Sequence, residues 1–440
     1  MKTPPFFLAL CVLVWALACG GEEKSKEGGK EGENSPVPGL APGEGQIPPP
    51  GERPPGEVPL LELGGNVEIT PSSAYIDAEL TATYDGEEAI HFQWKKEGEN
   101  IEGATGNTYS PSSAGSYAVT VGAPGHVSKT SPSVAVTVNP SLGATWTAYN
   151  NAFTRQGVNA ICYGNGRFVA GTSEGTLASS TDGITWTQSA SKPFGTDTSG
   201  NSAVYAVAYG NGRFVAAGKP QGNVAYSEDD GETWVAVADS VFGAGIYSLA
   251  WGGGRFVAGG YGGKMATSTD GKTWTAVKDS TFGSGAESGI YGIAYGNGRF
   301  VTVGRSKMAT STDGETWTAI QGVGNIQMVN IAWGGGRFVA LGVLGSGGRT
   351  AHSTDGITWT FADSDTAFFG IAYGGGKFVA GGGGKMVYST DGEKWTAVSN
   401  STFVGTGGAI SKIAYGGGKF IATGKAGASS NSYGQIAYSP

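Results

Sequence analysis

The sequence predicts an all-β chain with more than one domain. Glycine accounts for 79 of its 440 residues, well above the usual share of about 7%. The glycines do not follow the three-residue period of collagen but lie beside Val, Phe, Tyr and Trp, which suit short strands. From residue 144 onward, one motif recurs seven times. Many short strands joined by tight turns account for these three observations.

The first element is an apolar run that ends at Ala18 and has the length of a signal-peptide core rather than a membrane span. We therefore expect residues 1–18 to be a signal peptide. Residues 16–20 read ALACG, which resembles the lipobox of bacterial lipoproteins, with Ala16 in place of the usual Leu. The resemblance implies that Cys19 carries a lipid that anchors the chain in the bacterial cell envelope. The alternative is an ordinary signal peptide cleaved near Ala18.

Residues 19–57 are predicted to be a disordered tether. Between residues 20 and 57 there are eight prolines, ten glycines and almost no large apolar side chain, so this segment lacks the material for a core. Its eight acids and four bases account for half of the formal net charge of −8. The folded part is therefore only mildly acidic, and it offers no basic face to nucleic acid or anionic lipid.

The folded part contains a single cysteine, Cys162, because Cys11 leaves with the signal peptide and Cys19 would carry lipid. No disulfide can form within one mature chain. Cys162 occupies a position that holds a small residue in every later repeat, which predicts a buried, unreactive side chain. The equivalent residues are Ala208, Ala250, Ala294, Ala332, Ala372 and Ala414.

Residues 58–140 show short alternating segments separated by Gly, Asn and Pro turns, the pattern of a small β-sandwich. The position of Trp94, and the residues that lead to Tyr117, resemble immunoglobulin-like modules of bacterial surface proteins. The two cysteines of that family would fall near Ala82 and Val119. The alternative is another small β-module, and in either case the segment acts as a spacer or binds a ligand.

Residues 141–440 are organised as repeats. An Ala-aromatic-Gly element, with Cys replacing Ala in the first copy, recurs at spacings of 38 to 46 residues, which suits one four-stranded propeller blade of about 40 to 50 residues. The aromatic residues are Tyr163, Tyr209, Trp251, Tyr295, Trp333, Tyr373 and Tyr415.

Each repeat is expected to form strands a to d, from the axis outward. The seventh repeat ends after strand c, whereas residues 144–147, ahead of the first strand a, have the sequence of a strand d. We therefore predict a seven-bladed β-propeller in which this N-terminal strand completes the last blade and removes an open sheet edge. Phenylalanines that follow the strand-d Trp by seven to nine residues are expected to be core wedges: Phe153, Phe194, Phe242, Phe282, Phe368 and Phe403.

The turn between strands c and d reads Ser-Thr-Asp-Gly-x-Thr/Lys-Trp in most repeats and SEDDGETW at residues 227–234. It resembles the Asp-box, or BNR repeat, of sialidases, sortilin-type receptors and photosystem II assembly propellers. The resemblance implies a structural role, in which Ser and Asp cap the turn and Trp packs between sheets. It assigns this role to Asp182, Asp230, Asp270, Asp313, Asp355 and Asp391.

The resemblance also raises an alternative function, a sialidase-like glycoside hydrolase, which would need three arginines that converge on a carboxylate. Most arginines here are periodic, and we expect them to meet nearby Asp-box carboxylates: Arg167, Arg213, Arg255, Arg299 and Arg337, with Lys377 and Lys419 at the same position. The exceptions are Arg155, Arg305 and Arg349, which are predicted to lie in d–a and b–c loops. These loops share one face of the ring, so the three arginines are candidate ligand contacts, or simply solvated side chains.

Tyr205, Tyr247 and Tyr291 share an early position of strand a in three consecutive repeats. Their rings are candidates for stacking on a sugar or an apolar side chain at the mouth of the ring, and the alternative is packing between blades. No spacing of Cys, His and Asp resembles a metal site, and no cofactor is implied. The blades are near-identical, whereas catalysis needs unlike residues that converge. We therefore expect a monomeric, membrane-anchored binding or scaffold protein for a protein or glycan ligand.

Overall fold

The structure is a computed structural model that describes residues 60–439, apart from residues 89, 150–152, 154–155, 196–201, 221–222, 239–240, 286, 400–402, 404–408 and 426–433. It also contains one short strand, β1 (Trp15–Leu17), which pairs parallel with β30 (Gln327–Gly334). That strand belongs to the segment that the sequence predicts to be removed on export. The predicted tether, Cys19 and Arg155 lie outside the described residues. Within those residues, no helix is long and apolar enough to cross a membrane.

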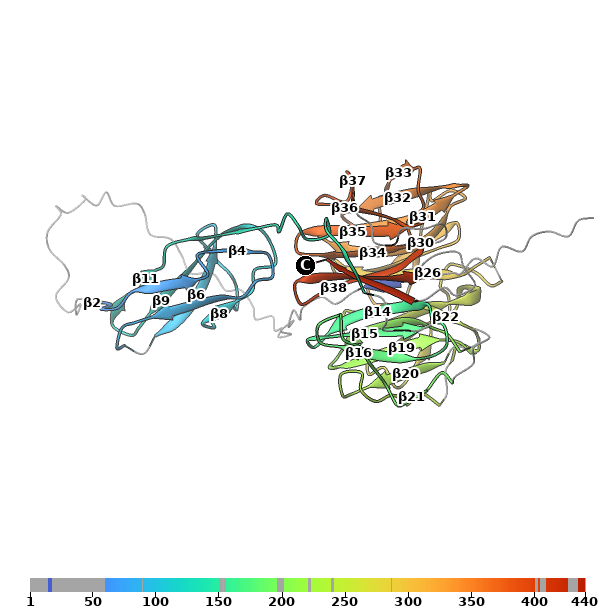
Figure 1. The fold of residues 1–440 in the computed structure, drawn as a ribbon, viewed down its shortest axis with the longest axis horizontal. Coiled ribbons are helices and arrows are strands. Elements are labelled where there is room, and N and C mark those ends of the chain that lie inside the picture. Colours follow the sequence, from blue (N-terminus) through green and yellow to red (C-terminus); the bar gives the residue numbers. More distant parts are fainter. Residues whose placement is uncertain are drawn as a thin grey trace, which may run out of the picture.

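The N-terminal module consists of two packed sheets and a peripheral strand pair (Figure 1). One sheet has the order β4-β12-β9-β6-β7, with β11 also on β9, the second has the order β3-β5-β8, and β10 pairs with β2. The strands are β2 (Leu61–Glu62), β3 (Val67–Thr70), β4 (Ser73–Tyr75), β5 (Leu80–Tyr84), β6 (His91–Lys96), β7 (Glu99–Asn100), β8 (Thr108–Tyr109), β9 (Gly115–Gly122), β10 (His126–Val127), β11 (Lys129–Thr130) and β12 (Val134–Thr137).

The core of this module follows from strand alternation, because every second residue of β3 and β12 is buried. Trp94 and Tyr117 are buried at its centre. The Trp94 indole N–H donates to the carbonyl of Gly106 at 2.9 Å, and the Tyr117 hydroxyl donates to the carbonyl of Ser113 at 2.9 Å. Both polar groups are therefore satisfied inside an otherwise apolar core.

The repeats form antiparallel sheets of strands a to d. In chain order, the first four sheets contain β14 (Val158–Gly164), β15 (Arg167–Thr172), β16 (Leu177–Ser180) and β17 (Thr187–Gln188); β18 (Val204–Gly210), β19 (Arg213–Gly218), β20 (Val224–Ser227) and β21 (Val235–Ala236); β22 (Ile246–Gly252), β23 (Arg255–Gly260), β24 (Met265–Ser268) and β25 (Thr275–Ala276); and β26 (Ile290–Gly296), β27 (Arg299–Gly304), β28 (Lys307–Ser311) and β29 (Thr318–Ile320). A single 3₁₀ turn, η1 (Tyr261–Gly263), lies between β23 and β24.

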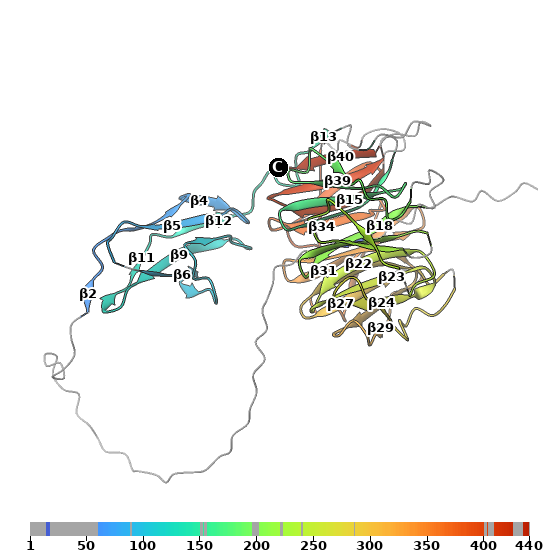
Figure 2. The ribbon, with the colours of Figure 1, turned by 90° about the horizontal axis from the view of Figure 1, so that it is seen from below.

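The remaining sheets follow the same plan. They contain β30, β31 (Arg337–Leu344), β32 (Gly347–Ser353) and β33 (Thr360–Ser364); β34 (Gly370–Gly374), β35 (Lys377–Gly382), β36 (Lys385–Ser389) and β37 (Thr396–Ala397); and β38 (Ala409–Gly416), β39 (Lys419–Lys425), β40 (Gly434–Ser439) and β13 (Thr147–Tyr149). Each innermost strand contacts the innermost strand of the next repeat, and β38 contacts β14. The sheets therefore close into a ring, which Figures 1 and 2 show from the side.

Neighbouring sheets pack through aromatic side chains that fit against glycine. The glycine that ends each strand a lies under the strand-a aromatic of the next repeat. A Cβ atom on Gly210 would lie 2.1 Å from the Trp251 ring, so a larger residue would push the sheets apart. The predicted phenylalanine wedges are all buried, which confirms that part of the prediction.

The c–d turns are held by one hydrogen-bond pattern. In the fourth repeat, the Ser311 hydroxyl accepts the backbone N–H of Gly314, and the Asp313 carboxylate accepts the N–H groups of Glu315 and Thr316. The indole of Trp317 donates to the carbonyl of Gly314 at 3.1 Å. The same capping role holds for Asp182, Asp270, Asp355 and Asp391.

The second repeat requires a correction, because its capping residue is Asp229 and not Asp230. Asp229 accepts the N–H of Thr233 at 2.9 Å and the hydroxyl of Ser227 at 2.7 Å. This turn has one extra residue before its glycine, and Asp230 takes it up in a left-handed conformation with φ of 59°. The Asp230 carboxylate instead accepts a hydrogen bond from the Asn165 amide at 2.7 Å.

The ring is closed by a c–d turn assembled from both ends of the folded chain. Strand β13 pairs antiparallel with β40, which supplies the strand missing from the seventh repeat. The Ser439 hydroxyl accepts the N–H of Gly143 at 2.6 Å, and the Trp146 indole donates to the Gly143 carbonyl at 2.9 Å. The carbonyl of Ser141 accepts the N–H groups of Ala144 and Thr145, the role that Asp plays in the other turns.

Candidate ligand-binding face

The two ends of the ring differ in what covers them. The a–b and c–d turns lie at one end, and the N-terminal module packs there (Figure 1). The Asp77 carboxylate accepts the Tyr415 hydroxyl at 2.8 Å and the N–H of Gly375 at 3.3 Å. Ile76 and Val138 lie so close to Gly376 that a Cβ atom there would approach both within 3.0 Å. The d–a and b–c loops at the opposite end are therefore turned away from the module.

Three tyrosines gather at the loop end of the innermost strands. The ring centroids of Tyr205 and Tyr247 are 5.7 Å apart, and those of Tyr247 and Tyr291 are 6.0 Å apart. The structure thus brings together the three tyrosines that the sequence singled out. We call them the tyrosine strip.

The strip exists because each tyrosine occupies a β-bulge. The pairing of β18 with β19 shifts register between Val204 and Ala206, which leaves Tyr205 as the extra residue. The same shift occurs at Tyr247 and Tyr291. A bulge re-aims its side chain relative to the regular alternation of a strand, so these rings meet their counterparts in the adjacent repeats.

The strip becomes more buried from one end to the other. Tyr205 and Tyr247 are half-buried, whereas Tyr291 is only 6% exposed and packs against Gly289. Burial raises the pKa of Tyr247 to about 12, with a further contribution from its two neighbours in the strip. Tyr291 therefore serves mainly to pack one repeat against the next, while the rings of Tyr205 and Tyr247 remain partly accessible to a ligand.

Cations lie beside both ends of the strip. The Lys219 ammonium lies 5.7 Å from the centroid of Tyr205. At the other end, Arg305 forms an ion pair with Glu287 at 2.5 Å. Burial raises the pKa of the Tyr291 hydroxyl. The Arg305 guanidinium lowers that pKa and the Glu287 carboxylate raises it further, so both charges lie close enough to act on the ring. The sequence did not single out Lys219 or Glu287, because nothing in the repeat pattern marks them.

Arg349 does not join this group. It was expected in a loop, but the hairpin of β31 and β32 extends further than in other repeats, so Arg349 lies within β32. It pairs with Asp363 of β33 and lies 6.0 Å from the Phe361 ring. Arg305 and Arg349 therefore each pair with an acid of their own surroundings, and no contact among the described residues brings them together. Arg155 lies outside those residues.

The periodic strand-b cations do not meet the capping aspartates, which corrects the expectation from the sequence. Those carboxylates are occupied by backbone N–H groups. Arg167 pairs with Glu232 at 3.0 Å, on the turn of the next repeat, and Arg255 and Arg337 pair with glutamates at the same position. Where no such glutamate follows, the partners vary. Lys377 donates to the carbonyls of Pro140 and Leu142, and Lys419 donates to that of Asp182. Arg213 pairs with Glu228 at 3.1 Å, and Arg299 donates to the Thr310 hydroxyl.

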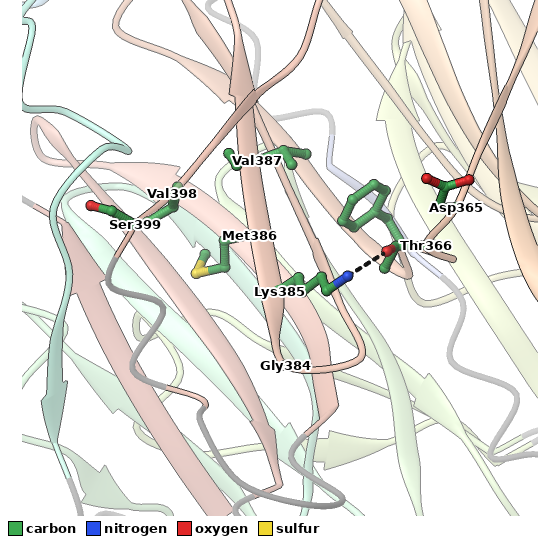
Figure 3. Close-up of a pocket in the computed structure, with 10 residues that line it drawn as sticks. Asp365, Thr366, Gly384, Lys385, Met386, Val387, Val398 and Ser399 are labelled. Atoms are coloured by element: carbon green, nitrogen blue, oxygen red, sulfur yellow. Dashed lines mark hydrogen bonds between the residues drawn. The ribbon is translucent and has the colours of Figure 1, made fainter.

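A cavity of about 590 Å³ lies beside β36 and β37 (Figure 3). Its walls include the apolar side chains of Met386, Val387 and Val398, and Lys385 donates to the Thr366 hydroxyl at 3.2 Å at its rim. Asp365 and Ser399 also line the cavity but lie on opposite sides of it (Figure 3), so its polar groups do not converge. We therefore assign it no ligand.

Other candidate groups are structural. Cys162 is buried in the described core, at 1% exposure. Among the described residues, no group of three or more His, Cys, Asp or Glu side chains could hold a metal ion. The amine of Lys412 on β38 is fully buried without a hydrogen-bond partner in the described part of the chain, and burial lowers its pKa well below the usual value.

The chain matches no family model and no curated protein. Among solved structures, it is similar to one described as YCF48 bound to a D1 peptide, with 17% identity and a TM-score of 0.52 over 67% of this chain and 96% of that chain. A second, the WD40 β-propeller domain of Doa1, shows 11% identity and a TM-score of 0.48 over 67% and 97%. At such identities the likeness concerns the fold alone. The ring of four-stranded antiparallel sheets is a β-propeller.

Proposed function

We propose that this chain is a membrane-anchored, extracytoplasmic binding protein that holds a segment of another protein on the loop end of its propeller. The observation that carries the proposal is the tyrosine strip: three rings from consecutive repeats, two of them partly accessible, at the end of the ring turned away from the N-terminal module. Aromatic side chains on a rigid scaffold supply large contact area at low entropic cost.

The proposal includes a seven-bladed ring with Asp-box turns and an immunoglobulin-like module. In its support, seven innermost strands contact one another in succession within the described residues. The Tyr117 hydroxyl bonds back to the Ser113 carbonyl, the arrangement known as a tyrosine corner in immunoglobulin-like folds. The module then acts as a spacer between the anchored tether and the ring.

The choice of a protein ligand over a glycan rests on the form of the strip. The rings pack on one another and on glycine backbone, so Tyr291 offers no open face to a sugar. The solved YCF48 structure holds a peptide, which is consistent with such a ligand on a propeller of this kind. Arg305 and Arg349 pair separately with acids, and this favours binding over sialidase-like hydrolysis.

The test is an array of peptides and glycans probed with the full-length chain and with a Tyr205→Ala, Tyr247→Ala, Tyr291→Ala variant. We expect peptide binding that the triple variant loses at least tenfold. The matched control is Asp270→Ala with Asp313→Ala, which should lower the melting temperature but leave binding by the folded fraction intact. Binding of glycans alone, or peptide binding that is lost only in the control, would overturn the proposal.

The anchor is tested separately. Cys19→Ala should abolish incorporation of labelled palmitate and release the chain from the membrane fraction, because stable anchoring requires acyl chains. Unchanged labelling in this variant would exclude Cys19 as the lipid site.

A further inference from the structure

The tyrosine strip is accompanied by a second row of side chains, one strand further from the axis. Each residue of this outer row directly follows the last glycine of its strand b: Lys219 after Gly218, Tyr261 after Gly260, and Arg305 after Gly304. Strand a pairs with strand b, so the backbone N–H of Lys219 donates to the Ala203 carbonyl, just ahead of the strip. The N–H of Tyr261 donates to the Gly245 carbonyl in the same way.

The register therefore places Lys219 and Tyr261 beside the strip. Arg305 instead forms a backbone bridge with Gln327 at the start of β30, and its guanidinium is close enough to Tyr291 to lower the pKa of that hydroxyl. The order is a cation beside Tyr205, an aromatic beside Tyr247 and a cation beside Tyr291. The central residue of the outer row, Tyr261, is 44% exposed, so its ring remains open to a ligand. It is also close enough to Tyr247 to raise the pKa of that hydroxyl, after burial and the two strip neighbours.

The two cations of the outer row, Lys219 and Arg305, differ in whether an acidic side chain of the protein pairs with them. Lys219 forms no ion pair with any described residue, and its ammonium instead lies over the Tyr205 ring. Arg305 pairs with Glu287, but both side chains are largely exposed, at 48% and 71%. A solvated pair of this kind is weak, so an acid of a ligand can compete for the Arg305 guanidinium.

We infer that the two rows bind an extended protein segment with an apolar or aromatic centre and a carboxylate on each side; this inference rests on the proposed function. The centre would lie on Tyr247 and Tyr261, and the two carboxylates would meet Lys219 and Arg305. The ligand runs around the ring, across the second, third and fourth repeats, rather than along the axis.

The geometry also sets the spacing of the two acids. Neighbouring rings of the strip are 5.7 and 6.0 Å apart, measured between ring centroids. An extended chain rises about 3.3 Å per residue, so about four residues cover the strip and separate the two acids. We therefore expect acids that are adjacent in the sequence to meet only one of the two cations.

The experiment uses fluorescence anisotropy with synthetic labelled peptides and the full-length chain. The first peptide is Gly-Ser-Asp-Val-Phe-Thr-Val-Asp-Ser-Gly, the second has both Asp replaced by Asn, and the third has the two Asp adjacent. We expect the first peptide to bind at least about fivefold more tightly than the other two. Its affinity should fall as the salt concentration rises from about 50 to 500 mM. The protein variants are Lys219→Met, Arg305→Met and Glu287→Gln, with Lys278→Met as a control for loss of an exposed loop cation.

Lys219→Met and Arg305→Met should each weaken the first peptide about three- to fivefold, Glu287→Gln should strengthen it, and Lys278→Met should leave it unchanged. Equal affinity for the Asp and Asn peptides, or an equal loss in Lys278→Met, overturns this inference. If the Asn peptide binds as tightly and Tyr247→Ala still abolishes binding, the proposed function stands and only the acidic pattern is wrong. If Tyr247→Ala has no effect on any peptide, the proposed function fails as well.

Discussion

At the scale of single residues, the side chain that fits at a given position of strand a depends on the groups it meets in the next repeat. The amide of Asn330 on β30 donates to the Phe369 carbonyl of the following repeat at 2.8 Å. Lys412 occupies the equivalent position on β38, where its amine is buried without a partner in the described structure. The sequence could identify the repeat position of this lysine but not its burial, because the repeat allows Ala, Ser, Gly and Asn there.

Lys412→Met is expected to stabilise the fold by about 1–3 kcal/mol at pH 7, because Met removes a buried, unsatisfied polar group. An unfolded lysine has a pKa of about 10.4, whereas burial lowers the pKa of Lys412 well below its usual value. Between the lowered pKa of the folded state and about pH 10.4, the unfolded state therefore binds a proton that the folded state lacks, and the free energy of unfolding of the wild type falls as the pH is lowered. The gain from Met should thus be larger at pH 7 than at pH 10.

Urea unfolding at these two pH values measures the effect, with the exposed Lys278→Met as the control. A loss of stability in Lys412→Met, or a gain that does not depend on pH, would contradict this reading of the buried amine.

At the scale of elements, the strands and the turns were predictable from the sequence, whereas the bulges were not. Alternation and glycine-rich turns mark each strand, and the structure has strands a to c where these patterns lie. The register shift that produces the tyrosine strip leaves no mark in the pattern, because a bulge inserts a residue without changing the composition of the strand. The capping role of Asp229 was missed for a similar reason. The turn has two adjacent aspartates, and the sequence does not show which of them is the inserted residue.

Ser439→Ala tests the turn that joins both ends of the folded chain. This variant removes the acceptor of the Gly143 N–H, and we expect a cost of about 1 kcal/mol in the free energy of unfolding. Hydrogen exchange should also accelerate at residues 147–149 and 436–438, where β13 pairs with β40. The control is Ser311→Ala, which removes the same bond from a continuous turn and should leave exchange in β13 unchanged. If β13 exchanges at the wild-type rate in Ser439→Ala, that turn does not hold the closing strand.

At the scale of the whole molecule, the N-terminal module and the ring form one joint around Asp77, Tyr415 and Gly375. The sequence predicted both parts but not their contact, because no pattern within one domain specifies which surface of another it meets. Burial, followed by the nearby Asp77, raises the pKa of the Tyr415 hydroxyl, so the phenol remains a donor to the carboxylate at physiological pH. The joint fixes which end of the ring is left for a partner.

Asp77→Ala should loosen this joint without unfolding either part. Spin labels at Glu102→Cys and Lys394→Cys, in the full-length chain with its own cysteines replaced by alanine, should give a broader distance distribution in this variant. The control is Asp85→Ala, a carboxylate of the module that bonds to Asn66 within the module. A distribution as narrow as that of the control would mean that apolar packing alone holds the joint.

The central claim is that the loop end of the ring carries the partner. Photo-cross-linking of a peptide that binds the full-length chain, followed by mass spectrometry, tests it most directly. We predict adducts within residues 203–220, 241–264 and 287–309, which carry the tyrosine strip and the outer row. Adducts confined to the c–d turns, or to the N-terminal module, would contradict the claim.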